Sequence, residues 1–460
     1  MKTSLELRGF AKEFRGETLD RPVFANKQLL ILATMVCAAL AHCFSLGVAA
    51  IGFSAVAILI YLFLDVDQCL ISLYVCLPFF NVMTIAVGTT SLYYLLVIIF
   101  IAKFVTSKRA GVGRNKIVLL LCVVLFTLGN IDDLSKYVRW IIVFIPLVLT
   151  FNTTILSKNL VALITWYSVS SILSTCFGYY LSEHGLLALT SSYVYTEGGN
   201  LNRFGGLVGD PVMFSETLVL LFACNIVLML KGEGAKWTGL IAIGLAVPCA
   251  LSYSKSALLL IAALVLFSIA YLMTHQMLKR ETILKGIFAL CLIALAIIAV
   301  VIYASSNQAG DLMSGLMRRF ESNDLTTGRL ALWSAYWSWL QSQDIFANLF
   351  GVGFSAYSET AFPYAGILLN RCHNVYLETW ILFGGVGAVA AIGALSACVV
   401  KALMRKVELA YFIPLLILAV FGIVLHGHTE SFYYFLWIIA LGMVRMPGSA
   451  AKRQRVQNGA

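Results

Sequence analysis

Long apolar segments, separated by shorter polar ones, fill most of the chain. Runs of about 20 apolar residues have the length that a helix needs to cross a bilayer. The hydropathy pattern predicts about fourteen of them, with twelve spans plus re-entrant pieces as the alternative. It therefore predicts an all-α, polytopic integral membrane protein. The predicted spans are 28–45, 47–65, 68–86, 91–108, 116–131, 137–152, 159–181, 212–230, 237–252, 256–274, 286–304, 375–398, 410–427 and 430–446.

Two of the polar segments, 182–211 and 305–374, are much longer than the others. Loops well beyond a dozen residues are uncommon unless they carry function. We expect both to be extracytoplasmic loops, the larger one containing interfacial amphipathic helices. The predicted organisation is a cytoplasmic tail (1–27), N-terminal spans (28–181), the first outer loop (182–211), central spans (212–304), the large outer loop (305–374), C-terminal spans (375–446) and a basic cytoplasmic tail (447–460).

Composition and charge agree with a membrane protein. The chain is 60% hydrophobic and 12% charged, whereas soluble domains carry about 25% charged residues. With the N-terminus in the cytoplasm, 24 of the 32 Lys and Arg residues fall on cytoplasmic segments, as the positive-inside rule requires. The net charge of +10 is therefore mostly an orientation pattern. Without a basic soluble domain, it gives no support to a nucleic-acid partner.

The basic residues left on the outer side are mostly arginines, whose planar fork binds phosphate oxygens through paired hydrogen bonds. Arg203 opens a segment with three glycines, 203–210, and glycines let a backbone approach a ligand closely. Arg329 follows two threonines that predict a helix cap. The apolar residues behind it predict an interfacial amphipathic helix; they are Leu330, Trp333, Trp337 and Leu340.

The large polar segment ends in Arg371, Cys372, His373 and Asn374, directly before an apolar span. Ionisable groups at a membrane edge are candidates for function, and histidine exchanges a proton near neutral pH. Cys372 suggests a thiol nucleophile, but no supporting residues are apparent. A second polar turn holds His426, His428 and Glu430. A metal site there would need a further ligand, so we expect a structural or acceptor-binding role and no metal.

His373-Asn374 is followed after nine residues by Gly384-Gly385-Val386-Gly387. This spacing resembles the signature of the bacterial O-antigen ligase and polymerase superfamily, which includes O-linked oligosaccharyltransferases. The Arg-Phe-x-Gly segment at Arg203, the helix beginning at Arg329 and the Phe-Gly-x-Gly-Phe turn at 350–354 resemble other elements of that superfamily, in the same order. The resemblance covers roughly residues 200 to 445.

The resemblance implies a glycosyltransferase at the outer face of the bacterial cytoplasmic membrane, with an undecaprenyl-diphosphate-linked saccharide as donor. His373 would act as general base toward the acceptor hydroxyl, and Arg203 and Arg371 would stabilise the diphosphate without a metal or other cofactor. The expected substrate-binding residues are Arg329, Asn374, Arg139, Arg319 and Glu430. The glycines expected to allow close packing are Gly384, Gly387 and Gly205.

Three functions remain open at this point. A polymerase would join lipid-linked repeat units, and we favour it because no appended acceptor domain is present. A ligase would pass the glycan to a lipid or protein acceptor. A lipid-linked oligosaccharide transporter would need charged residues inside the spans, and most spans have none. The expected partners are the lipid-linked oligosaccharide, the bilayer and other membrane proteins of polysaccharide assembly.

Overall fold

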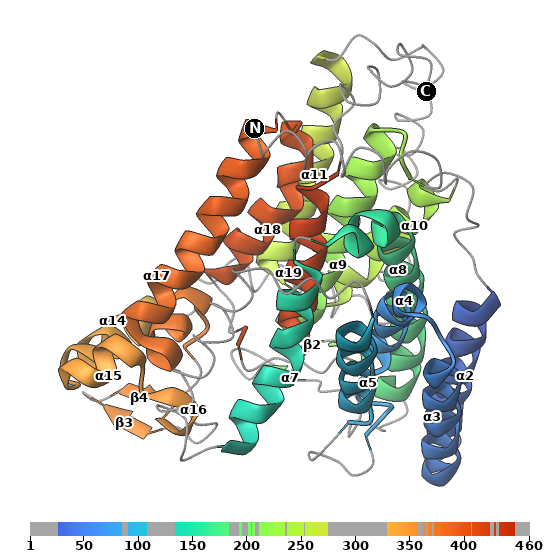
Figure 1. Cartoon of the computed structure of the whole chain (residues 1–460), viewed down its shortest axis with the longest axis horizontal. Coiled ribbons are helices and arrows are strands. Elements are labelled where there is room, and N and C mark those ends of the chain that lie inside the picture. Colours follow the sequence, from blue (N-terminus) through green and yellow to red (C-terminus); the bar gives the residue numbers. More distant parts are fainter. Residues whose placement is uncertain are drawn as a thin grey trace.

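The computed structural model describes residues 26–84, 91–107, 134–151, 153–183, 193–195, 201–203, 205–207, 211–234, 237–252, 254–274, 329–356, 362–364, 367–369, 372–405, 407–423, 427–428 and 432–446. Figure 1 shows a bundle of helices with a smaller group of short elements beside its lower end. The predicted spans 116–131 and 286–304 lie outside the described residues, and so do Arg319, Arg371 and Glu430.

The helices of the bundle overlap the spans predicted from the hydropathy. The N-terminal ones are α2 (Asn26–Cys43), α3 (Gly47–Leu62), α4 (Val66–Cys76), η1 (Leu77–Phe79), α5 (Tyr93–Thr106), α7 (Leu134–Thr150) and α8 (Thr154–Glu183). The central ones are α9 (Pro211–Leu230), α10 (Thr238–Leu251) and α11 (Lys255–Thr274). The C-terminal ones are α17 (Val375–Met404), η3 (Leu409–Phe412), α18 (Ile413–Gly422) and α19 (Tyr433–Met443).

The smaller elements belong to the two long polar segments. In the larger segment, α14 (Arg329–Gln341), α15 (Ile345–Phe350) and α16 (Gly353–Ala356) precede a hairpin of β3 (Phe362–Tyr364) and β4 (Ile367–Leu369). These elements gather beside the lower end of α17 in Figure 1. The other segment holds an antiparallel hairpin of β1 (Tyr193–Tyr195) and β2 (Leu201–Arg203). Two hairpins of three-residue strands leave the fold all-α in class.

Four of the described helices are long and apolar enough to cross a membrane, within α2, α8, α9 and α17. Seven shorter apolar helices accompany them in the described part of the chain. The protein is therefore a multi-pass helical membrane protein, as the hydropathy predicts.

Helix α9 forms the centre of the bundle and contacts α8, α10, α11, α18 and α19. Residues 213–228 are all buried, so its neighbours cover every side of the helix. A helix that is apolar all round is stable when its neighbours surround it. By contrast, the second half of α17 exposes Val389 (71%) and Ile392 (62%), apolar side chains suited to contact with lipid.

Candidate functional site

His373 and Asn374 form the start of α17. Asn374 is the N-cap, and its Oδ1 accepts hydrogen bonds from the backbone N–H groups of Tyr376 and Leu377, both at 3.0 Å. His373 has φ +48°, in the left-handed region that residues other than glycine rarely adopt. Backbone of this kind persists where the surroundings hold it, and it is enriched at functional sites. Because the cap engages Oδ1, the predicted substrate contact of Asn374 falls to its Nδ2 amide group.

Cys372 is held from two directions. The indole Nε1 of Trp333 on α14 donates to the Cys372 carbonyl oxygen at 2.8 Å, and the Cys372 thiol lies 3.3 Å from the Asn374 carbonyl oxygen. The Cys372 side chain is fully buried. A nucleophilic cysteine needs access and an electropositive setting, so this thiol has a structural role and fixes the backbone next to His373.

Two glycines bring the turn after α15 against the backbone of α17. Gly384 interrupts α17 with φ +65° and ψ −172°. A Cβ built on Gly384 would lie 2.3 Å from the Leu349 carbonyl group, and one built on Gly351 (φ +89°) would lie 2.4 Å from the Leu382 carbonyl group. The Val352 N–H donates to the Ile381 carbonyl oxygen, which the interruption of the helix makes available, at 2.8 Å. We call this the glycine contact; it docks the α14–α16 unit onto α17.

Replacing Gly384 with alanine is expected to destabilise the protein by about 1–3 kcal/mol from backbone strain alone, because this φ and ψ region is essentially confined to glycine. The Cβ would also collide with backbone rather than with a movable side chain. Gly393→Ala is the matched control, since its Cβ would meet nothing within 4 Å on the same helix. Thermal unfolding in detergent should show a lower midpoint for Gly384→Ala only. Equal midpoints for the two variants would contradict the contact.

Glu378 connects α17 to the turn between α18 and α19. Its side chain is completely buried, and its Oε2 accepts hydrogen bonds from the backbone N–H groups of Gly427 (2.6 Å) and His428 (3.1 Å). The His428 ring packs edge-on against Phe383, with 5.3 Å between ring centroids. The carboxylate therefore fixes the position of this turn relative to the first turns of α17.

An aromatic cluster surrounds this junction. The Trp140 ring on α7 packs against Phe383 with 4.8 Å between centroids, and the Phe354 ring on α16 lies 6.1 Å from Phe383. Tyr137 and Trp140 stack on each other at 5.6 Å on the buried face of α7. Rings from α7, α16 and α17 thus meet directly beside the glycine contact, and they hold the three elements together.

Arg203 lies at the end of β2, opposite Tyr193 in the hairpin. Three residues later, at Gly206 (φ +62°), the chain packs tightly between two helices, and this position requires glycine. A Cβ on Gly206 would lie 2.6 Å from the Phe214 ring of α9, and one on Gly178 of α8 would lie 3.1 Å from the Gly206 backbone. Gly205 is also buried. The backbone after Arg203 is thereby fixed to α8 and α9.

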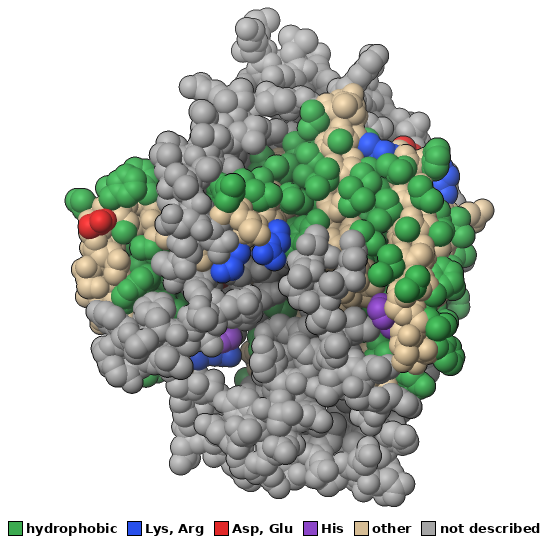
Figure 2. Space-filling view, turned by 90° about the horizontal axis from the view of Figure 1, so that it is seen from below, with side chains coloured by type: hydrophobic (Ala, Val, Ile, Leu, Met, Phe, Trp, Pro, Cys, Tyr) green, Lys and Arg blue, Asp and Glu red, His purple; other side chains and the backbone are tan. Residues whose placement is uncertain are grey.

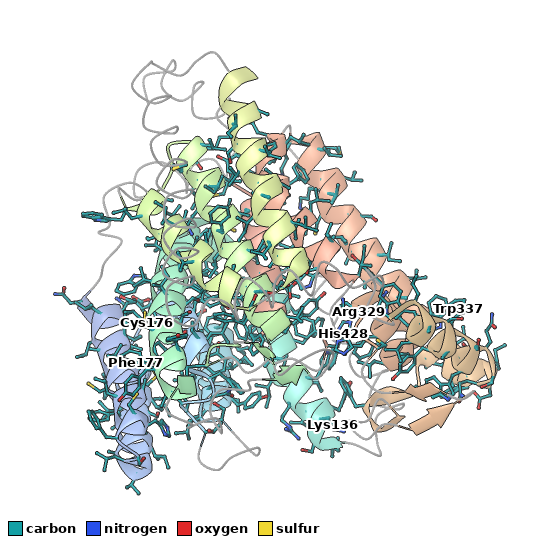
Figure 3. The ribbon with its side chains drawn as sticks, turned by 180° about the vertical axis from the view of Figure 1, so that it is seen from behind. Lys136, Cys176, Phe177, Arg329, Trp337 and His428 are labelled. Atoms are coloured by element: carbon teal, nitrogen blue, oxygen red, sulfur yellow. The ribbon has the colours of Figure 1, made fainter. Side chains whose placement is uncertain are left out.

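Arg329 is the first residue of α14. Figure 3 shows it at the end of α14 nearest the bundle, with Trp337 farther out, and His428 on the same side of the bundle. The helix is formed as predicted, but its apolar residues do not form one buried stripe. Leu330 (60%) and Trp337 (48%) are exposed, whereas Tyr336 and Leu340 are buried. Apolar residues occupy both faces, which suits a helix between protein and lipid.

Arg139 lies on the exposed face of α7, turned away from the face that carries Tyr137 and Trp140. Its guanidinium donates to the Ser135 carbonyl oxygen (3.4 Å) and hydroxyl (3.2 Å) one turn earlier. Arg139 thus bonds to its own helix, and its contact with the substrate stays a prediction. Figure 2 shows the molecule from below. On the side seen there, basic and histidine side chains lie among hydrophobic ones.

Sequence reasoning passed over several residues that build this junction, namely Trp140, Glu378, Thr379 and Tyr434. Glu378 offered a detectable pattern, since it is a lone acidic residue inside an apolar span. Within the described residues, no three His, Cys, Asp or Glu side chains gather as metal ligands. His426 and Glu430, two members of the predicted polar turn, lie outside those residues.

The fold and the site define a class: a multi-pass helical membrane protein whose polar groups gather at the start of one interrupted span. Residues 240–392 match the O-antigen ligase family, and this domain supports the predicted place of the chain in the O-antigen ligase and polymerase superfamily. The matched segment contains Arg329, His373 and Gly384, whereas Arg203 precedes it. No curated protein and no solved structure matches the chain.

Proposed function

We propose that the protein is a glycosyltransferase of the cytoplasmic membrane that transfers saccharide from undecaprenyl diphosphate at the extracytoplasmic face. The observation that carries this proposal is the placement of His373. It stands in a rare backbone conformation at the start of α17, fixed by the Asn374 cap, within a segment that matches the O-antigen ligase family. A proton-accepting group at a membrane edge suits a lipid-linked donor and a hydroxyl acceptor.

In the proposed reaction His373 accepts the proton of the acceptor hydroxyl as its oxygen attacks the anomeric carbon of the donor sugar. The bond from that carbon to the diphosphate oxygen breaks, and undecaprenyl diphosphate leaves with the bonding electron pair. Negative charge grows on the diphosphate, and arginines positioned in advance stabilise it most where water is excluded. We assign this role to Arg203 and Arg371, with Arg329 as a further contact. No metal ion takes part in the step.

The acceptor distinguishes two versions of this function. In a polymerase the acceptor is the sugar of a second lipid-linked unit, so the glycan grows. In a ligase the acceptor is a lipid or protein that carries no diphosphate. The family description, O-antigen ligase, favours the second version. Both use the same groups at the start of α17.

Purified protein incubated with lipid-linked repeat units separates the versions. A ladder of longer lipid-linked glycans identifies a polymerase, and product formed only with an added acceptor identifies a ligase. The rate should be unchanged by EDTA. If neither product forms while the lipid-linked units cross the membrane of a vesicle, transfer is excluded and transport is favoured.

A further inference from the structure

A chain of hydrogen bonds runs from α7 to the first turn of α17. The Trp140 Nε1 lies 2.5 Å from the Tyr434 hydroxyl, which contacts His428 Nδ1. His428 Nε2 lies 2.7 Å from the Thr379 hydroxyl, and that hydroxyl lies 2.7 Å from the Val375 carbonyl oxygen. These five residues come from α7, α17, α19 and the turn before α19, so the chain connects segments far apart in the sequence.

The direction of every bond in this chain follows from its two ends. The indole N–H of Trp140 can only donate, and a carbonyl oxygen such as that of Val375 can only accept. Tyr434 therefore accepts from Trp140 and uses its single proton toward His428 Nδ1. Thr379 uses its single proton toward Val375, so it accepts from His428 Nε2–H. With a neutral imidazole, this Nε2–H tautomer is the one arrangement that satisfies all four contacts.

Burial favours the same neutral form. His428 sits in the turn between α18 and α19, packed against the rings of Phe383, Tyr433 and Tyr434. Desolvation there lowers the pKa of His428 to about 3. The Glu378 carboxylate, which contacts the turn, binds its backbone N–H groups. His428 thus stays neutral at physiological pH and serves as a fixed connector between two hydroxyl groups.

We propose that Tyr434, His428 and Thr379, with Glu378 holding the turn, form a positioning chain that sets the orientation of His373. This inference rests on the proposed function, because it assigns His373 the general-base role. The chain ends at Val375, two residues after His373, and the Glu378 N–H bonds the Asn374 carbonyl oxygen at 2.8 Å. A shift of Trp140 or α19 is therefore transmitted to the backbone that carries the base. Tyr434, His428 and Thr379 touch no reacting atom in this scheme.

Displacing a catalytic group by about 1 Å can cost 10²-fold in rate, so removing one bond of the chain should lower kcat more than it changes KM. We expect Tyr434→Phe and Thr379→Val each to lower kcat for glycosyl transfer about 10- to 100-fold. The KM for the lipid-linked donor should remain within about twofold, because binding groups are untouched. Thr379→Ser, which keeps the hydroxyl, should restore most of kcat.

Matched controls remove the same groups elsewhere in the bundle. Tyr93→Phe deletes a buried hydroxyl on α5 that donates to the Leu73 carbonyl oxygen of α4 at 3.2 Å. Thr165→Val deletes a hydroxyl bonded to Val161 at 2.8 Å, the same i−4 geometry as Thr379. Both controls should keep kcat within about twofold, since neither belongs to the chain. Thermal midpoints of all variants identify any that fail to fold.

A double variant separates one connected chain from two independent structural contacts. Tyr434→Phe combined with Thr379→Val should be no slower than the slower single variant, because both interrupt the same path. If the kcat losses of the two single variants multiply in the double variant, the positioning chain is overturned. It is also overturned if the single variants lose no more kcat than the controls. A wild-type protein without transfer activity would instead overturn the proposed function, so the two failures are distinguishable.

Discussion

Replacing His373 with alanine is expected to lower kcat for glycosyl transfer by about 10²- to 10⁴-fold, the range contributed by a general base in other enzymes. The KM for the lipid-linked donor should change little, since the side chain acts on the acceptor proton. Alanine at this position also keeps the cap of α17, because that cap is made by Asn374. The measurement is the initial rate of transfer by purified protein over a range of donor concentrations.

His42→Ala provides the control for this experiment. His42 lies in the last turn of α2, where its Nε2 is 3.3 Å from the Val82 carbonyl oxygen, so the same side chain is removed outside the site. Its variant should transfer at close to the wild-type rate. A His373→Ala protein with wild-type kcat would refute the general-base assignment. Burial lowers the pKa of His428 to about 3, so any loss of rate on acidification near neutral pH would not come from protonation of His428.

Arg203→Lys carries the second large expected effect, a loss of about 10²- to 10³-fold in kcat. Lysine retains the positive charge but presents a point charge instead of the planar fork that holds two diphosphate oxygens. The close packing of Gly206 between α8 and α9 fixes the backbone near residue 203. The loop therefore cannot move to restore the contact with the diphosphate that the lysine side chain loses. The rate and the donor affinity of the variant should be measured together.

Arg405→Lys is the matched control, because Arg405 is exposed at the C-terminal end of α17, the helix that His373 precedes. This substitution should leave transfer unchanged. If Arg203→Lys also transfers at the wild-type rate, a paired contact between Arg203 and the diphosphate is ruled out, and charge alone would suffice at this position.

The helices and the start of the site were predictable because local patterns determine them. Apolar runs gave α9 and α17 without tertiary information, and the predicted span 212–230 begins one residue after Pro211, the first residue of α9, where proline fits the first turn. The apolar run after Asn374 likewise predicted a helix start at residue 375. The His373 to Gly387 spacing pointed to the superfamily that the O-antigen ligase match supports.

The contacts that shape the site were not predictable, because they join residues distant in sequence. Glu378 meets the turn at Gly427 across 49 residues, and Trp140 meets Tyr434 across 294. Hydropathy also could not show which side of α14 is buried, since apolar residues surround that helix. The spacing pattern identified Gly384 but could not reveal its contact with Gly351, which depends on how α15 returns to α17.

The most direct test of the account measures lipid diphosphate and glycan product in one reaction. Purified protein in liposomes, supplied with undecaprenyl-diphosphate-linked saccharide and an acceptor, should release one undecaprenyl diphosphate for each glycosidic bond formed, and His373→Ala should release almost none. Saccharide that crosses the bilayer still attached to its lipid, with no diphosphate released, would contradict the account.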